Sequence, residues 1–178
     1  MIDIQQIREH TANSSIIEFA EFVIAGSDGK EFADYRKLDL MKISGLISHT
    51  FTFDYRNGIE DGLLLHHTGT FLDKFFGKNL TGKYVEDFYE VSEDAERLLE
   101  LYRNGYNNKK TAFACREVDF NFEFKKFRHA ESIVFQCSSS GETLNYGLGI
   151  ALYFESNQNQ TGSCRNGDSC SGGYRLLG

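Results

Sequence analysis

Three runs of regularly alternating side chains in the second half of the chain constrain the fold most. They are residues 118–124, 133–137 and 144–154, and in each run an apolar side chain recurs at every second position. A period of two places these side chains on one face of a β-strand. One-sided alternation is typical of an antiparallel sheet with one covered face and one wetter face. The runs therefore predict three antiparallel strands.

Two further strands are predicted nearer the N-terminus. One face of residues 46–55 carries Ile47, His49, Phe51, Phe53 and Tyr55. A second apolar run covers residues 63–70, and the turn signals Asn57-Gly58 and Asp61-Gly62 lie between the two runs. This arrangement predicts a hairpin with a loop of several residues.

An apolar helix is expected before the first strand, and a second helix is expected between the two groups of strands. Ser15 and Glu18 form a capping-box signature at the start of the first helix, and Gly26 suits its end. Its apolar stripe consists of Ile16, Phe19, Ala20 and Val23. This stripe either covers the domain or forms a dimer contact. Ser92 opens the second helix and is followed by two acidic residues.

Residues 63–89 connect the two groups of strands. The sequence predicts a strand that breaks at Gly69, a short apolar helix that ends at Gly77, and a tight passage from Asn79 to Gly82. Strands that are divided around a helical insert predict an α+β domain with helices on one face of the sheet.

The length of 178 residues predicts one domain with a tail. We expect an N-terminal helix and connector over residues 1–36, the domain over residues 37–155 and a flexible tail over residues 156–178. The tail is predicted from its polar composition. It contains Cys164 and Cys170, for which two tail thiols are favoured over a redox-dependent disulfide. Cys115 and Cys137 lie in predicted strands and are expected to act as small apolar residues.

Composition excludes several partners. A net charge of −7 argues against a nucleic-acid-binding surface, which needs clustered Lys and Arg. No run approaches the roughly 20 apolar residues that a membrane span requires. The first residues are polar and do not form a signal peptide. We therefore expect a cytoplasmic protein. The core must be built largely from the 16 Phe residues.

Four stretches resemble one bacterial class of PAS domains. They are Phe53-Asp54-Tyr55-Arg56, His67-Thr68-Gly69-Thr70, Phe76-Gly77-Lys78-Asn79-Leu80-Thr81-Gly82 and the downstream run SSSGETLNYGLGIALYF. The resemblance covers residues 38–154, and its most specific part is the Gly-Thr…Gly-x-Asn-Leu-Thr-Gly signature. It implies a stand-alone PAS-like domain with a five-stranded antiparallel sheet, helices on one face and an N-terminal helix.

The resemblance also implies a function. PAS domains are sensory or protein-interaction domains that hold a small molecule between sheet and helices, or none, and that often form homodimers through an N-terminal helix. Flavin photosensors of this fold carry a reactive Cys in a Gly-x-Asn-Cys turn, whereas Leu80 follows Asn79 here. Neither flavin nor haem is required by the sequence. The chain carries no kinase, cyclase or helix-turn-helix output, so a signal would pass to a protein partner.

A ligand pocket is predicted where the aromatic faces of the strands meet the helical insert. Its predicted residues are Phe53, Leu65, His67, Phe71, Phe75, Tyr84, Phe88, Phe120, Phe135 and Leu148. His67 is expected to face the interior, either as a hydrogen-bonded histidine like His49 or as a polar handle or haem ligand in the pocket.

Two other functions stay open. One is a ligand-free dimerisation or adaptor module, in which Gly147, Gly149 and Ala151 leave the wetter sheet face low enough for a helix to approach. The other is a small hydrolase or isomerase on a similar sheet. Catalysis is not favoured, because the carboxylates near the central stretch have the spacing of a solvated helix face, and Ser138 to Ser140 have the composition of a turn.

Overall fold

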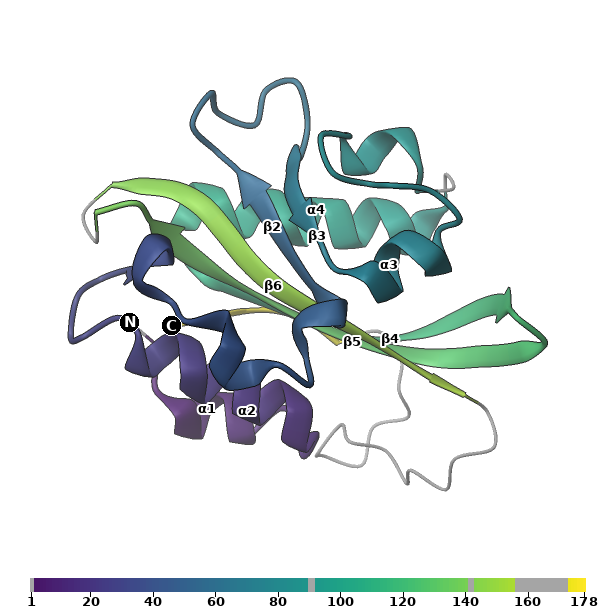
Figure 1. The fold of residues 1–178 in the computed structure, drawn as a ribbon, viewed down its shortest axis with the longest axis horizontal. Helices are drawn as coiled ribbons and strands as arrows, with labels where there is room; N and C mark the ends of the chain where they lie inside the picture. The colour runs from purple at the N-terminus through teal and green to yellow at the C-terminus, as the bar shows by residue number, and fades with distance from the viewer. Residues whose placement is uncertain (1, 90–91, 141–142, 156–172) are drawn as a thin grey trace.

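The computed structural model describes residues 2–89, 92–140, 143–155 and 173–178, and Figure 1 shows their arrangement. Within these residues the fold is a single mixed sheet with helices on both sides. The strands are β1 (Ala33–Asp34), β2 (Thr50–Asp54), β3 (Leu65–Thr68), β4 (Thr111–Phe122), β5 (Lys125–Ser138), β6 (Leu144–Glu155) and β7 (Gly173–Leu177).

The strand order is β3-β2-β6-β5-β4-β7, and every pair along it is antiparallel. β1 adds a short parallel pairing with β5. The five strands expected from the sequence are β2 to β6. If these five strands are numbered 1 to 5 along the chain, their order across the sheet is 2-1-5-4-3. The predicted α+β class with an antiparallel sheet is therefore confirmed, and β1 and β7 extend the sheet.

Four α-helices and four 3₁₀ turns are described. The helices are α1 (Ile4–Arg8), α2 (Ser14–Ala25), α3 (Thr70–Phe75) and α4 (Glu93–Asn108). The 3₁₀ turns are η1 (Tyr35–Lys37), η2 (Leu40–Ile43), η3 (Ile47–His49) and η4 (Val85–Asp87). No helix among the described residues is both long enough and apolar enough to cross a membrane.

Helices lie on both faces of the sheet (Figure 1), and each face has its own apolar core. Ile16, Phe19, Ala20 and Val23 of α2 are buried in the first core, against Phe135 of β5 and other strand residues. In the second core, α3, η4 and α4 pack over Phe51, Phe53 and Val134. The expectation of a wetter sheet face is therefore wrong, because the N-terminal helices cover the face that the helical insert leaves open.

The helix caps follow local chemistry. Ser92 caps α4 as predicted, since its hydroxyl accepts a hydrogen bond from the Ala95 amide. The predicted cap of α2 is displaced by two residues, because the Asn13 side chain accepts from the amides of Ser15 and Ile16. An Asn reaches the same amides as a Ser, so the helix begins earlier than the Ser-x-x-Glu pattern indicates.

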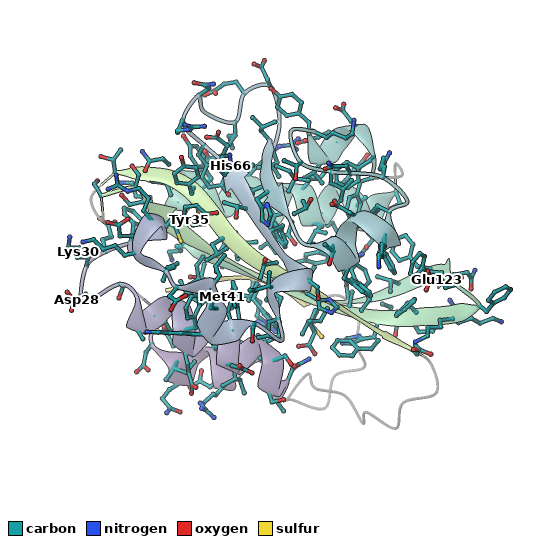
Figure 2. All side chains as sticks on the ribbon, in the orientation of Figure 1. Asp28, Lys30, Tyr35, Met41, His66 and Glu123 are labelled. Atoms are coloured by element: carbon teal, nitrogen blue, oxygen red, sulfur yellow. The ribbon has the colours of Figure 1, made fainter. Side chains whose placement is uncertain are left out.

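The strands differ from the prediction at three places. Residues 47–49 form the turn η3, so β2 begins only at Thr50. β4 and β5 are longer than predicted and extend beyond the rest of the sheet as a hairpin, with Glu123 at its tip (Figures 1 and 2). The expected flexible tail is wrong for its last residues, because β7 pairs with β4 and buries Leu177. Cys164 and Cys170 lie outside the described residues.

Ile2 and Gly178 lie next to each other although they are far apart in the sequence (Figure 1). A Cβ atom added to Gly178 would lie 3.5 Å from Cβ of Ile2. Ile2 and Leu177 are both buried in the core that α2 covers. Both ends are therefore held against the sheet by apolar contacts.

Candidate functional site

A small cavity lies between the helical insert and the sheet. Its volume is about 50 Å³. The sheet and the insert both contribute to its walls, which consist of Phe51, Phe53, Leu65, Thr68, Leu72, Phe76, Leu80, Val85, Phe88, Tyr89, Leu98, Tyr102, Ala151 and Tyr153. Sites for drug-sized ligands have volumes of about 300–1,000 Å³. In this conformation the cavity accepts a molecule of a few heavy atoms and is too small for a flavin or a haem.

Three of the ten predicted pocket residues line this cavity: Phe53, Leu65 and Phe88. Phe71, Phe75 and Phe120 lie next to it, because their rings contact the lining residue Tyr153. Tyr84 is half-buried beside Gly62. Whether any of these residues binds a ligand stays a prediction.

The placement of three predicted residues is wrong. Phe135 and Leu148 lie on the opposite face of the sheet, in the core covered by α2. Phe135 is two residues from Ile133 in β5, and Leu148 is two residues from Ile150 in β6, so each pair shares a face of the sheet. That face packs against the N-terminal helices. His67 is exposed, since a register shift after Thr52 turns both histidines of β3 outward. His67 is therefore neither a handle nor a haem ligand in this cavity.

The two glycines proposed to admit a helix lie under aromatic rings. A Cβ atom at Gly147 would lie 2.5 Å from Tyr55 Oη, and one at Gly149 would lie 2.5 Å from Phe51 Cζ. The rings of Phe51 in β2 and of Tyr55, which directly follows β2, thus pack over the β6 backbone and belong to the second core. The low sheet face admits the chain's own side chains, so the expectation that it receives a helix from outside is wrong.

The signature residues hold the insert to β3. Asp73 of α3 accepts hydrogen bonds from the Thr68 hydroxyl at 2.7 Å and from the Leu80 amide at 3.0 Å. Gly69 is required because a Cβ atom there would lie 2.3 Å from the Ser48 carbonyl oxygen. Leu80 itself is buried in the cavity wall. The loop therefore places an apolar side chain in the wall of the cavity.

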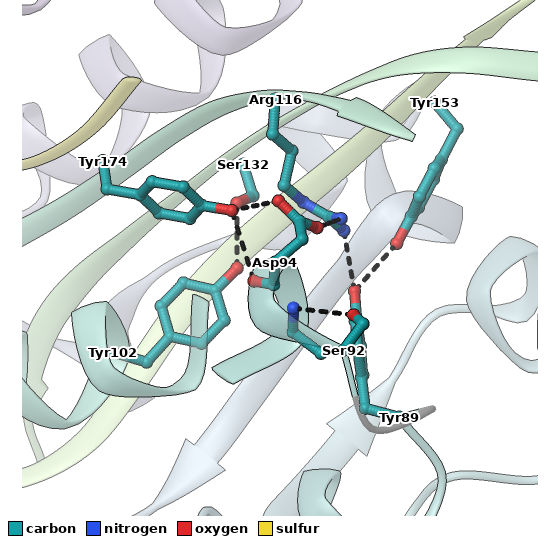
Figure 3. Close-up of polar contacts among 9 residues, drawn as sticks. Tyr89, Ser92, Asp94, Tyr102, Arg116, Ser132, Tyr153 and Tyr174 are labelled. Carbon is teal, nitrogen blue, oxygen red and sulfur yellow. Dashed lines mark hydrogen bonds and ion pairs between the residues drawn. The ribbon is translucent and has the colours of Figure 1, made fainter. Parts of the chain in front are cut away.

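A partly buried polar network that was not predicted from the sequence lies at one end of the cavity (Figure 3). Arg116 of β4 is only 4% exposed. Its Nη1 atom lies 2.5 Å from Asp94 Oδ2, and its Nη2 atom donates to Tyr89 Oη at 2.8 Å. Tyr174 of β7 donates to Asp94. One signal in the sequence could have indicated it: Arg116 follows Ala112 and Ala114 at a spacing of two residues, which places it on the same face of β4 as these buried alanines.

Tyrosines connect this network to the cavity. Tyr89 and Tyr153 both line it, and their hydroxyl oxygens lie 3.4 Å apart. Tyr102, also in the lining, shares a hydrogen bond of 2.8 Å with Ser132. Burial raises the pKa of Tyr102 and that of Tyr153 well above the ordinary value. Both phenols are therefore neutral hydrogen-bonding groups at physiological pH.

No protein-family model matches the sequence, and a search of curated proteins finds no match. Solved structures do resemble the fold. The PAS domain of BvgS from Bordetella pertussis is 13% identical, with a TM-score of 0.47 over 67% of this chain and 87% of that one. The light-state LOV domain of the blue-light photoreceptor Aureochrome1 is 12% identical, with a TM-score of 0.46 over 66% and 88%. These values say nothing of function, and the fold follows from the strand order itself.

Proposed function

We propose that the chain is a sensory module of the bacterial PAS class that carries the Gly-Thr…Gly-x-Asn-Leu-Thr-Gly signature. It acts in the cytoplasm, where it binds a small, mainly apolar molecule and passes a signal to a protein partner. The observation that carries the proposal is the cavity between insert and sheet, whose side-chain polar groups come only from Thr68 and three tyrosines among the described residues. Such walls favour binding of an apolar molecule, and they give the hydrolase or isomerase alternative no support.

The buried network supplies a route from the cavity to the edge of the sheet. Tyr89 lines the cavity and accepts from Arg116, which also pairs with Asp94 in the first turn of α4. Asp94 in turn accepts from Tyr174 of the edge strand β7. A ligand that displaces Tyr89 or α4 would therefore change contacts at β7. A partner that contacts this edge would bind the two states with different affinity, as a population shift requires.

The experiment uses a matched pair of substitutions in α4. Leu98 lines the cavity, whereas Leu101 is buried in the same helix without lining it. Leu98→Ala and Leu101→Ala should each lower the free energy of unfolding by about 2–5 kcal/mol. Benzene and xenon enter apolar cavities, including a new one of the kind that Leu101→Ala opens. Because Leu98→Ala enlarges a cavity that already exists, it should show the larger rise in melting temperature.

The second candidate function is the ligand-free adaptor, and the small volume of the cavity favours it. If neither probe stabilises the wild type or Leu98→Ala, the ligand-binding proposal is wrong and the adaptor remains. In that case the centre of the domain is filled by its own side chains, and the domain acts only by binding a partner protein or a second copy of itself.

A further inference from the structure

A second cluster of chemically reactive side chains lies on the face of the sheet opposite the cavity. Cys115 of β4 and Glu131 of β5 are direct partners in the antiparallel register. Direct partners project to the same face. His129 precedes Glu131 by two residues and therefore shares that face. The cluster faces α1 and α2, because Thr11, in the link between these helices, contacts Glu131.

The three potential ligand atoms already have the spacing of a metal site. Cys115 Sγ lies 3.7 Å from His129 Nε2, and His129 Nε2 lies 3.4 Å from Glu131 Oε1. All three atoms lie within 4.8 Å of one another. Around a tetrahedral zinc ion, with bonds of about 2.3 Å to sulfur and about 2.0 Å to nitrogen or oxygen, neighbouring ligand atoms are roughly 3.3–3.6 Å apart. The Sγ–Nε2 distance of 3.7 Å and the Nε2–Oε1 distance of 3.4 Å are close to this range.

The carboxylate of Glu131 has an unusual environment. Its side chain is fully buried, and a buried carboxylate is unfavourable unless a positive charge and hydrogen bonds compensate it. One oxygen accepts from the Thr11 hydroxyl at 2.9 Å. Among the described residues the one basic group that pairs with it is His129, which is charged only when protonated. A divalent cation would supply the missing positive charge, and Thr11 would orient the ligand from outside.

The redox state of Cys115 decides whether a metal can bind. Cys115 is disulfide-bonded in this structure. A dithiol reductant would transfer two electrons and two protons to this disulfide, which yields two thiols and leaves the dithiol as its own disulfide. A metal ion would then bind the Cys115 thiolate and release the thiol proton to solvent. The disulfide and the metal bond use the same sulfur atom, so the two states exclude each other.

From this geometry we infer that Cys115, His129 and Glu131 form a zinc-type metal site that is available only when Cys115 is reduced. Zinc accepts sulfur, nitrogen and oxygen ligands together, whereas calcium and magnesium favour oxygen alone. Three protein ligands leave a fourth position for water or an added molecule. The His129 side chain is 23% exposed and gives the ion a path from solvent. This site is independent of the cavity and would respond to thiol redox state.

The test is a titration of the full chain with Co²⁺, which replaces zinc and reports its ligands by absorption. After reduction with a phosphine, which supplies no competing thiolate, one equivalent of Co²⁺ should give a thiolate-to-cobalt charge-transfer band and tetrahedral d–d bands. Zinc should displace both. The oxidised protein should give neither band. Equal bands in the oxidised and reduced protein would overturn the inference, and this comparison needs no substitution.

Substitutions then assign the ligands. Cys115→Ser should abolish the charge-transfer band, whereas Cys137→Ser, which changes a free buried cysteine of β5, should retain it. Glu131→Gln and His129→Gln should weaken Co²⁺ binding. Thr11→Val should weaken it roughly 10- to 100-fold, as loss of an orienting hydrogen bond does. Circular dichroism checks that each variant folds. A full band in folded Cys115→Ser would place the metal elsewhere and contradict the assignment.

Discussion

At the scale of single residues, local backbone chemistry was predictable and side-chain direction near irregularities was not. The cap at Ser92 and the glycines of the signature loop follow from rules that involve a few neighbouring residues. His67 could not be placed, because a register shift between Thr52 and Phe53 changes which side of β3 faces inward. Such a shift depends on the neighbouring strand and leaves no mark in the sequence of β3 itself.

His49 should make stability depend on pH. Its ring lies 4.2 Å from that of Phe71, and its Nδ1 atom is buried without a hydrogen-bond partner among the described residues. Burial lowers the pKa of His49 below its ordinary 6.5, so the folded state favours the neutral ring. The unfolded chain then binds the proton more readily, and stability is lost as pH falls below about 6.5.

We expect His49→Phe, which keeps a ring against Phe71, to reduce this loss. The measurement is the urea midpoint between pH 7.5 and pH 5. The exposed His67 is the matched control, and His67→Gln should keep the wild-type slope. The pKa of His10 is also lowered by burial, so a smaller slope should remain in His49→Phe. An unchanged slope in His49→Phe would contradict the assignment.

At the scale of elements, the existence of the five strands was predictable, and their lengths were not. The alternating run in the sequence predicts a strand that starts at Val118, but β4 begins seven residues earlier, at Thr111. Arg116 and Glu117 interrupt the apolar pattern there, as His129 and Glu131 do in β5. Arg116, His129 and Glu131 are tolerated because they belong to the two polar clusters, and Glu117 is tolerated because it is exposed. The charged residues that hid the full lengths of β4 and β5 therefore lie in the segments that carry the most reactive side chains.

The tip of the β4–β5 hairpin should be stabilised by a change of turn residues. Glu123 and Phe124 have φ angles of 47° and 66°, a region that costs energy for residues with large side chains. Phe124 is also fully exposed, which contradicts its expected place on an apolar strand face. Two-residue turns with positive φ at both positions favour Asn-Gly.

We expect Glu123→Asn with Phe124→Gly to raise the free energy of unfolding by about 1 kcal/mol. Chemical denaturation would measure the change. Phe124→Ser alone is the control, because it removes the exposed ring and keeps the strain at a non-glycine residue. If the double variant is less stable than wild type, the turn is not strained as its φ angles indicate.

At the scale of the whole molecule, the order of helices and strands along the chain was predictable, and the cover on the second face of the sheet was not. Alternation identifies which residues share a face but cannot say what packs on it. α2 has an apolar stripe that either a dimer or the sheet could bury, and the sequence left both open. In the structure Phe19 of α2 packs against Phe135 of β5, with ring centroids 6.1 Å apart.

This packing predicts that residues 37–155 do not fold without the N-terminal helices. Removal of residues 1–36 would expose Phe135, Leu148 and Ile150, which are almost fully buried. A fragment of residues 37–155 should show poor dispersion in its amide NMR spectrum and no cooperative thermal transition, whereas the full chain should show both features of a folded protein. A well-dispersed spectrum from the fragment would restore the predicted domain boundary.

The meeting of Ile2 and Gly178 has a consequence for how the chain can be rearranged. A linker of a few residues from Gly178 to Ile2 would not cross the protein, because these two residues lie side by side. New ends could then be opened in the loop around Gly58, whose φ of +80° marks a turn outside the sheet ladder. The circularly permuted chain would begin next to β3 and keep every strand pairing, so the order in which the elements are synthesised could change while the fold stays the same.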